Sequence, residues 1–193
     1  MSKIRVGLSG GFGSFSEEAA LQYLAKSKIS DYQLDYLIDM ENVLKKLNEN
    51  IIDIGVFPFF NNNSGMVKQA FAAMGKYSFE VIDSFSLNIN QCLMAKELLD
   101  MNQVATIYSF EPALKQCHNF IFNHFSKATI IDWGDMADAA RAMSLNKFSA
   151  NAAIIGSKRS AQIFKLKVLC ENIQDHQNNL TEFVVVRSNI ANI

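Results

Sequence analysis

Residues 4–21 read I-R-V-G-L-S-G-G-F-G-S-F-S-E-E-A-A-L: a short β-branched run, a glycine-rich turn and a segment with helical periodicity. A strand that leads into a helix through such a turn is typical of an α/β unit. Ser16 suits the N-cap of the helix, and Glu17 and Glu18 would lie in its positive first turn. Backbone N–H groups and the helix dipole favour an anion there, so the turn at residues 10–16 predicts a carboxylate or phosphate site.

Two other interpretations of this turn stay open. The first is a tight turn that binds nothing. The second is a nicotinamide dinucleotide site, for which Gly11 and Gly13 would be the first two glycines of the fingerprint. Ser16 then stands where a third glycine allows close helix packing, although Asp35 ends the next strand at a plausible distance.

The same alternation of strands and helices continues along the chain, and the sequence contains no internal repeat. Further strands are expected at residues 34–38, 51–57, 79–95 (one strand or two), 104–108, 128–132, 151–155, 167–170 and within 178–186. Helices are expected at residues 40–48, 66–74, 112–122, 136–145 and 157–164. The run 51–57 should close at Pro58. This pattern predicts an α/β fold with two lobes that share crossing strands.

Composition narrows the classes of function. The 193 residues carry 18 basic and 19 acidic side chains, so neither nucleic acid nor an anionic membrane is expected as a partner. The sequence has no apolar run of 18 residues and no signal-peptide core, so we expect a cytoplasmic protein. The three cysteines and three histidines lack metal-ligand spacing, so no metal site is expected and the thiols should be reduced.

Five segments combine strand ends with glycine, amide or hydroxyl residues: 10–17, 55–67, 91–95, 108–117 and 172–183. In this order they resemble motifs of the prephenate dehydratase catalytic domain. The first is similar to G-P-x-G-T-F-S-E, the second to G-V-V-P-I-E-N-S-x-x-G-x-V, and the third to the family's cysteine-leucine segment. The fourth resembles Y-S-H-P-Q-A-L-x-Q-C, and the last resembles N-I-Q-D-x-x-x-N-x-T-R-F.

The resemblance implies a fold like that of type II periplasmic binding proteins, with two α/β lobes and the active site in the cleft between them. Residues 1–77 with 168–193 would form one lobe, and residues 78–167 would be inserted as the other. It also implies a homodimer. Many relatives carry a phenylalanine-sensing ACT domain after the last strand, and with only seven residues after Val186 we expect none here.

The resemblance further implies a lyase that converts prephenate to phenylpyruvate, carbon dioxide and water without a cofactor. Thr181, in the family's T-R-F motif, would protonate the departing hydroxyl group, as a poor leaving group requires. The dicarboxylate would be bound by residues at matching positions, which are Ser14, Asn61, Ser109, Gln116, Glu182 and Phe183.

Several residues at the expected site depart from the family motifs. Glu182 stands in place of the arginine, Phe60 in place of a glutamate before Asn61, and Gln91 in place of a histidine. Because prephenate is a dianion, a carboxylate at position 182 should weaken binding or rate by about a thousandfold or more. Three alternatives follow: a prephenate dehydratase, a divergent enzyme that acts on arogenate or decarboxylates prephenate without aromatisation, or a non-catalytic binding protein.

Overall fold

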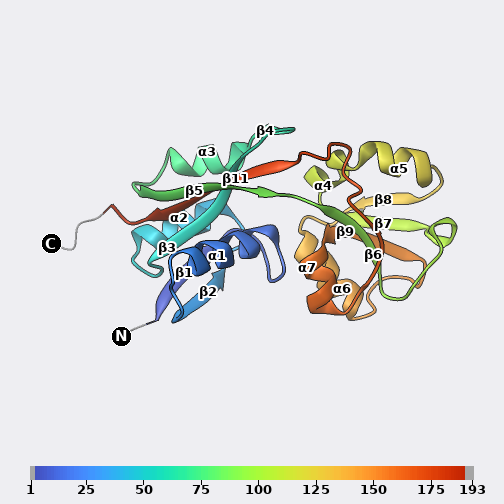
Figure 1. Cartoon of the computed structure of the whole chain (residues 1–193), viewed down its shortest axis with the longest axis horizontal. Coiled ribbons are helices and arrows are strands. Elements are labelled where there is room, and N and C mark those ends of the chain that lie inside the picture. Colours follow the sequence, from blue (N-terminus) through green and yellow to red (C-terminus); the bar gives the residue numbers. More distant parts are fainter. Residues whose placement is uncertain (1–2, 190–193) are drawn as a thin grey trace. The chain divides into compact units, whose positions relative to one another are not determined.

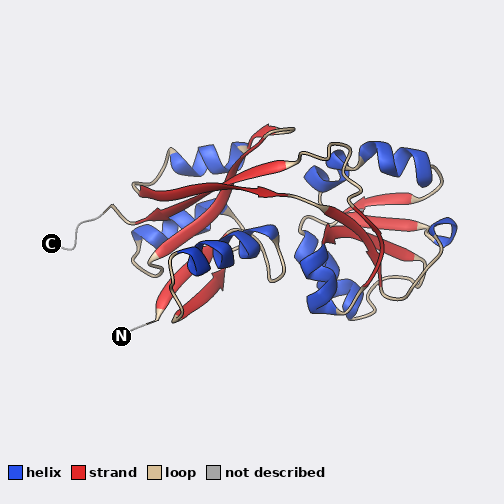
Figure 2. Cartoon of the chain, viewed as in Figure 1, coloured by secondary structure: helices blue, strands red, loops and turns tan. Residues whose placement is uncertain are grey.

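The computed structural model describes residues 3–189, so residues 1–2 and 190–193 of the predicted first lobe lie outside the described part. The described residues separate into two compact units, each built on its own β-sheet (Figures 1 and 2). Unit 1 comprises residues 3–11, 15–88 and 180–189, and unit 2 comprises residues 12–14 and 89–179. No helix in residues 3–189 has the length and apolar character needed to span a bilayer.

Unit 1 has a mixed sheet. Its strands are β1 (Ile4–Leu8), β2 (Tyr32–Tyr36), β3 (Ile54–Asn61), β4 (Gly65–Met66), β5 (Glu80–Asn88) and β11 (Leu180–Arg187), and its helices are α1 (Phe15–Lys26), α2 (Met40–Asn48) and α3 (Lys68–Met74). The strand order is β2, β1, β3, β11, β5, with β4 paired to β3. β1 is parallel to β2 and β3, whereas β11 is antiparallel to β3 and β5.

The two faces of this sheet are covered by different helices. Helices α2 and α3 pack on the face that carries Phe57, Val184 and Val186, and α1 packs on the sheet's other face (Figure 1). Gly55 allows α2 to approach, since a Cβ there would lie 2.7 Å from a Val43 methyl group. Side chains on β11 alternate between the faces, so Phe183 and Val185 lie on the face opposite Val184 and Val186.

Unit 2 repeats this layered plan. Its strands are β6 (Gln91–Ala95), β7 (Thr106–Ser109), β8 (Thr129–Asp132), β9 (Ala152–Ser157) and β10 (Lys167–Glu171), and its helices are η1 (Met101–Gln103), α4 (Glu111–Gln116), α5 (His118–His124), α6 (Met136–Ser144) and α7 (Lys158–Phe164). The strand order is β10, β6, β9, β7, β8. Met94 and Ile154 face a core with α6 and α7, and Leu93 and Ile155 face one with α4 and α5.

All three cysteines lie in unit 2 and are free thiols. Cys92 on β6 and Cys117, between α4 and α5, are buried, whereas Cys170 on β10 is half-buried. Burial raises the pKa of the Cys92 and Cys117 thiols, because a thiolate loses hydration in apolar surroundings. The thiols are therefore packed as small apolar side chains.

Most predicted elements are confirmed, and the helix at residues 40–48 is confirmed residue for residue. Asp39 caps this helix by accepting a hydrogen bond from the Asn42 N–H at 2.8 Å. The stretch at residues 79–95 is two strands rather than one. The N-cap prediction for Ser16 is wrong, because α1 begins at Phe15 and Ser16 is a buried residue of its first turn.

Two predicted boundaries are also wrong. β3 does not close at Pro58 but continues to Asn61. A register shift, in which Phe183 pairs with Pro58 and Glu182 with Phe60, leaves Phe59 as a bulge beside the proline. A bulge tolerates a residue that lacks an N–H donor.

The helix predicted at residues 112–122 is instead two helices that meet at Cys117. The Gln116 carbonyl accepts the Asp175 N–H at 2.7 Å, and the Asp175 carboxylate accepts the Asn119 N–H at 3.0 and 3.1 Å. Both contacts join segments more than 50 residues apart in sequence, so the local helical pattern of residues 112–122 does not reveal the break.

The chain passes from one unit to the other at positions that differ from the lobe boundaries that we predicted. We predicted boundaries at 77/78 and 167/168, whereas the units divide at 88/89 and 179/180, with residues 12–14 also in unit 2. The reason lies in strand pairing, since β5 pairs along β11 in unit 1, and β10 pairs with β6 in unit 2.

Candidate functional site

Thr181 and Asn61 form a buried polar pair in unit 1. β11 and β3 are antiparallel, and their register places Thr181 directly opposite Asn61. The Asn61 Nδ2 atom donates to Thr181 Oγ1 at 2.9 Å and to the Leu180 carbonyl at 3.1 Å. Asn61 is 3% exposed and Thr181 is 9% exposed, so the Thr181 hydroxyl is held in a largely dry environment.

The other end of the Asn61 amide is held by the turn that follows β3. Its Oδ1 atom accepts hydrogen bonds from the N–H groups of Asn63 and Ser64, both at 2.9 Å, and from the Ser64 hydroxyl at 3.0 Å. These donors fix which end of the amide faces Thr181. A threonine hydroxyl has one donor and two acceptor positions, and Asn61 uses an acceptor position. Within the described chain no acceptor takes the Thr181 hydroxyl hydrogen, so it can be donated to a ligand.

Glu182 and Phe183 do not share the surroundings of the Thr181 hydroxyl. Strand alternation turns Glu182 to the face that carries Val184 and Val186, opposite Thr181. Glu182 is half-buried, and no cation within residues 3–189 pairs with it. Phe183 lies on the same face as Thr181 but is only 1% exposed, so it is a core side chain of unit 1.

A cluster of side-chain amides forms a second polar group, in unit 2. Gln116, the last residue of α4, accepts two hydrogen bonds at Oε1: from Gln91 Nε2 at 3.1 Å and from Asn179 Nδ2 at 3.0 Å. Asn179 Nδ2 also donates to the Ile89 carbonyl at 3.1 Å. Gln91 and Asn179 are buried, whereas Gln116 is half-buried.

The segment after β10 holds this cluster in place. The Gln174 Oε1 atom accepts the Gln91 backbone N–H at 2.9 Å, and Asp175 contacts the Gln116 carbonyl. Gln174 is 3% exposed. The resemblance to an N-I-Q-D motif therefore has a local physical basis, because its last two residues position Gln91 and Gln116.

Ser109 is fully buried at the end of β7, and its hydroxyl donates to the Ile155 carbonyl of β9 at 3.0 Å. This hydrogen bond joins two neighbouring strands of the unit 2 sheet. A direct contact between Ser109 and a ligand stays a prediction.

Ser14 is half-buried and immediately precedes α1. The turn before it packs against the start of α7, where the Gly13 carbonyl accepts the Ser157 hydroxyl at 2.9 Å and the Ser160 hydroxyl at 2.8 Å. Gly13 has a φ of +89°, and a Cβ there would lie 3.2 Å from Ser160 Oγ, so glycine is required. Anion binding by this turn stays a prediction.

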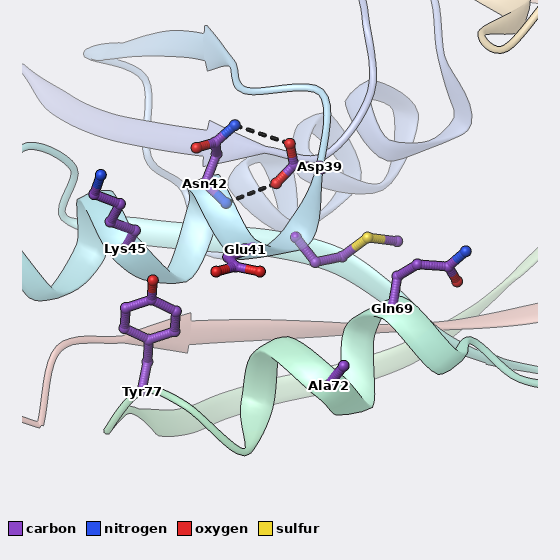
Figure 3. A pocket seen from close by; sticks show the side chains of 8 residues that line it. Asp39, Glu41, Asn42, Lys45, Gln69, Ala72 and Tyr77 are labelled. Carbon is purple, nitrogen blue, oxygen red and sulfur yellow. Dashed lines mark hydrogen bonds between the residues drawn. The ribbon is translucent and has the colours of Figure 1, made fainter.

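A hollow of about 500 Å³ lies between α2 and α3 of unit 1 (Figure 3). It is open to solvent and contains none of the predicted site residues. Both of its carboxylates have partners: Asp39 caps α2, and Glu41 pairs with Lys76 at 2.8 Å. Within residues 3–189, no group of three or more His, Cys, Asp or Glu side chains is placed to hold a metal ion.

The structure thus brings the predicted residues together only in part: Thr181 joins Asn61, and Gln116 joins two residues that we had not predicted as site residues. Those residues are Gln91 and Asn179. Both stand in segments already singled out in the sequence, and an amide beside a strand end was the available signal. Their hydrogen bonds to Gln116 join residues 25 and 63 positions apart in the sequence, and no local pattern encodes such contacts.

Comparison with known proteins supports the motif assignment. The family model for prephenate dehydratase matches residues 6–191. A prephenate dehydratase from Methanocaldococcus jannaschii is 30% identical over 175 residues, which cover 90% of this chain and 61% of that protein. An Arabidopsis thaliana protein, "Arogenate dehydratase/prephenate dehydratase 1, chloroplastic", is 26% identical over 185 residues, covering 96% of this chain and 45% of its own length. The chain spans about half the length of the curated relatives it matches.

Solved structures show the same fold. A prephenate dehydratase from Arthrobacter aurescens in complex with L-Phe superposes with a TM-score of 0.83 at 23% identity, covering 97% of this chain and 61% of that one. A periplasmic substrate-binding protein of an ABC transporter from Coxiella burnetii gives a TM-score of 0.55 at 14% identity, covering 96% of this chain and 85% of that one. The fold is therefore the periplasmic-binding-protein-like α/β fold of prephenate dehydratases. Since the family model covers residues 6–191, the chain belongs to the prephenate dehydratase family.

Proposed function

We propose that this protein is a lyase that converts prephenate to phenylpyruvate, carbon dioxide and water. The observation that carries the proposal is the Thr181 hydroxyl, which accepts a hydrogen bond from Asn61 and retains its own hydrogen for donation. Family membership supplies the reaction, and the pair supplies a proton donor of fixed direction.

In the proposed reaction, the bond between the ring and its carboxylate breaks and its electron pair enters the ring. The ring carbon–oxygen bond breaks at the same time, and its electron pair leaves with the hydroxyl oxygen. Thr181 donates its hydrogen toward that oxygen as negative charge develops, so that water departs rather than hydroxide. The net proton comes from solvent and restores the threonine hydroxyl. Aromatisation of the ring drives the reaction.

The substrate is a dicarboxylate, and we propose that the Gln116 amide and the turn at Ser14 supply hydrogen-bond donors to it. Ser109 and Phe183 would then support the site from within their cores, in keeping with their burial. Glu182, which lies on the other face of the unit 1 sheet from Thr181, would act on the substrate only through its longer-range field.

We also propose that the protein works in the cytoplasm as a homodimer. The resemblance to the family motifs supports the homodimer, and the absence of an apolar run of 18 residues in the sequence is compatible with the cytoplasm. Sedimentation velocity over a hundredfold range of concentration tests the oligomer, and a single species with the mass of one chain, 21.6 kDa, would contradict it.

The deciding experiment is incubation of the purified protein with prephenate and, separately, with arogenate. Products are followed by absorbance and by mass. Phenylpyruvate from prephenate is the expected result. Turnover of arogenate alone, the second candidate that the name of the Arabidopsis relative supports, would redirect the proposal, and so would a decarboxylated product that is not aromatic. Thermal stabilisation by prephenate without any product would indicate a binding protein.

A further inference from the structure

The hydrogen bonds of the amide cluster in unit 2 determine where each side-chain amide places its oxygen and its nitrogen. Asn179 must direct its Nδ2 toward the Ile89 carbonyl, because a carbonyl can only accept. The same nitrogen lies 3.0 Å from Gln116, so the Gln116 atom that faces it must be the oxygen. Gln91 lies 3.1 Å from that oxygen and must therefore present its nitrogen. One backbone carbonyl thus sets the orientation of three side chains in succession.

This orientation leaves the Gln116 NH₂ group able to donate to a ligand. Both donors into Gln116 contact Oε1, and no acceptor within the described residues lies at hydrogen-bond distance from Nε2. The side chain is half-buried, and Nε2 is not among the buried atoms that lack a partner, so it reaches the surface. Gln116 therefore presents two N–H donors and no acceptor, which suits an acceptor-only group such as a carboxylate.

This arrangement leaves the side-chain oxygen of Gln91 without a hydrogen-bond donor from residues 3–189. The residue is 1% exposed, and its Oε1 atom is buried with no donor in the described part of the chain. A buried acceptor without a partner is unfavourable. The backbone of Gln91 is held by β6 and by Gln174, and the side chain is enclosed by the surrounding residues. Only the Nε2 end of Gln91 is used, and its partner is Gln116.

We propose that Gln91 is a positioning residue which, together with Asn179, locks the Gln116 amide with its NH₂ group toward a carboxylate of the ligand. Without the Gln91 donor, Oε1 of Gln116 keeps one partner and the amide can rotate to present an oxygen, which repels a carboxylate. Gln91 thereby determines specificity for an anionic ligand without contacting it. That the ligand is prephenate rests on the proposed function, whereas the orientation of the amide does not.

Gln91→Met tests this inference, because it removes the donor at nearly constant volume and also removes the unpaired oxygen. We expect KM for prephenate to rise about fivefold to tenfold, the value of about one net hydrogen bond, with kcat nearly unchanged. The thermal unfolding midpoint should change by no more than a few degrees. Gln91→His, which restores an N–H donor, should recover most of the affinity. Gln162→Met, the same change at an exposed position of α7, is the control and should have the wild-type KM.

Phenylpyruvate carries a carboxylate, and its binding can be measured without any reaction. Titration with phenylpyruvate therefore tests this inference independently of the proposed function. In ¹⁵N-labelled wild-type protein the Gln116 side-chain NH₂ resonances, identified by their loss in Gln116→Glu, should shift on titration with phenylpyruvate. In Gln91→Met the shift should be reduced and the apparent Kd raised by the same factor as KM. Unchanged affinity in Gln91→Met, or a lower unfolding midpoint that Gln91→His restores without restoring affinity, would overturn the positioning role. Absence of turnover with intact phenylpyruvate titration would reject only the proposed function.

Discussion

Asn61 in unit 1 and Gln116 in unit 2 each lie at the centre of a group of hydrogen-bonded side chains. The two groups differ in which residue keeps a hydrogen-bond donor for a ligand. Every polar end of Asn61 is occupied, and the hydrogen left for use belongs to its neighbour Thr181. Gln116 is occupied only at its oxygen, and the donors left for use are its own. In both groups the oxygen of the central amide already accepts hydrogen bonds from its neighbours, and this sets the direction of the remaining donor before any ligand arrives.

Thr181→Val should break the unit 1 group most severely. The substitution keeps the shape of the side chain and removes the hydroxyl, while Asn61 Nδ2 retains the Leu180 carbonyl as an acceptor. We expect kcat to fall by about 10²–10⁴, the usual contribution of a positioned proton donor, with little loss of stability. Steady-state kinetics on prephenate measures this, and Thr181→Ser is the matched control. Wild-type kcat in Thr181→Val would remove Thr181 from the mechanism.

Asn61→Asp reverses the direction of the hydrogen bond between residues 61 and 181, while the turn after β3 keeps its hydrogen bonds. The carboxylate still accepts from Asn63 and Ser64, but it cannot donate to Thr181 and becomes an acceptor for the Thr181 hydrogen instead. We expect kcat to fall by about a hundredfold, near the lower end of the range for Thr181→Val. If kcat falls less than threefold at an unchanged unfolding midpoint, the direction of this hydrogen bond does not matter.

Gln116→Glu makes the corresponding change in unit 2. One carboxylate oxygen still accepts from Gln91 and Asn179, and the other replaces the NH₂ donors. A charged hydrogen bond is worth about 1.5–3 kcal/mol, so KM for prephenate should rise at least about tenfold, mostly without loss of kcat. Together with the two previous variants, this would separate a rate-determining group in unit 1 from an affinity-determining group in unit 2. A loss confined to kcat would assign both groups the same role.

Glu182→Gln should have the smallest effect. The sequence alone predicts that a carboxylate beside Thr181 weakens binding or rate by about a thousandfold or more, but strand alternation turns Glu182 to the opposite face of the sheet. We expect kcat/KM to change by less than about threefold at moderate ionic strength, because the remaining interaction is long-range and screened. A hundredfold gain would show that Glu182 does face the substrate.

The sequence predicted elements well wherever the signal was local. The helix predicted at residues 40–48 matches α2 residue for residue, and what holds this helix is local: Asp39 caps it, and residues 43, 44 and 47 form its buried side. It failed where a partner distant in sequence decides the outcome, as when Asp175 separates α4 from α5. The bulge at Phe59 has the same origin, because the proline is tolerated only through the register of β11.

The candidate site divides along the same line. Motif matching singled out Thr181, Asn61 and Gln116, since each is carried by a short recognisable segment. It could not reveal that the Ser109 hydroxyl is buried and donates to the neighbouring strand, or that Gln91 donates to Gln116. Both hydrogen bonds depend on contacts between segments far apart in sequence. It also treated Glu182 as a neighbour of Thr181 in space because the two are neighbours in sequence. In a β-strand, adjacent residues are the ones that point apart.

The placement of the three thiols makes the two units distinguishable in a single chemical experiment. Cys92 and Cys117 are buried and their pKa values are raised by burial, so an alkylating reagent can reach them as thiolates only after unit 2 opens. Cys170 is half-buried and should react sooner. Unit 1 contains no cysteine in its sequence and stays silent. The rates of modification at residues 92 and 117 therefore report the local opening free energy of unit 2 alone. Comparison with global unfolding would show whether the two units unfold together or one at a time.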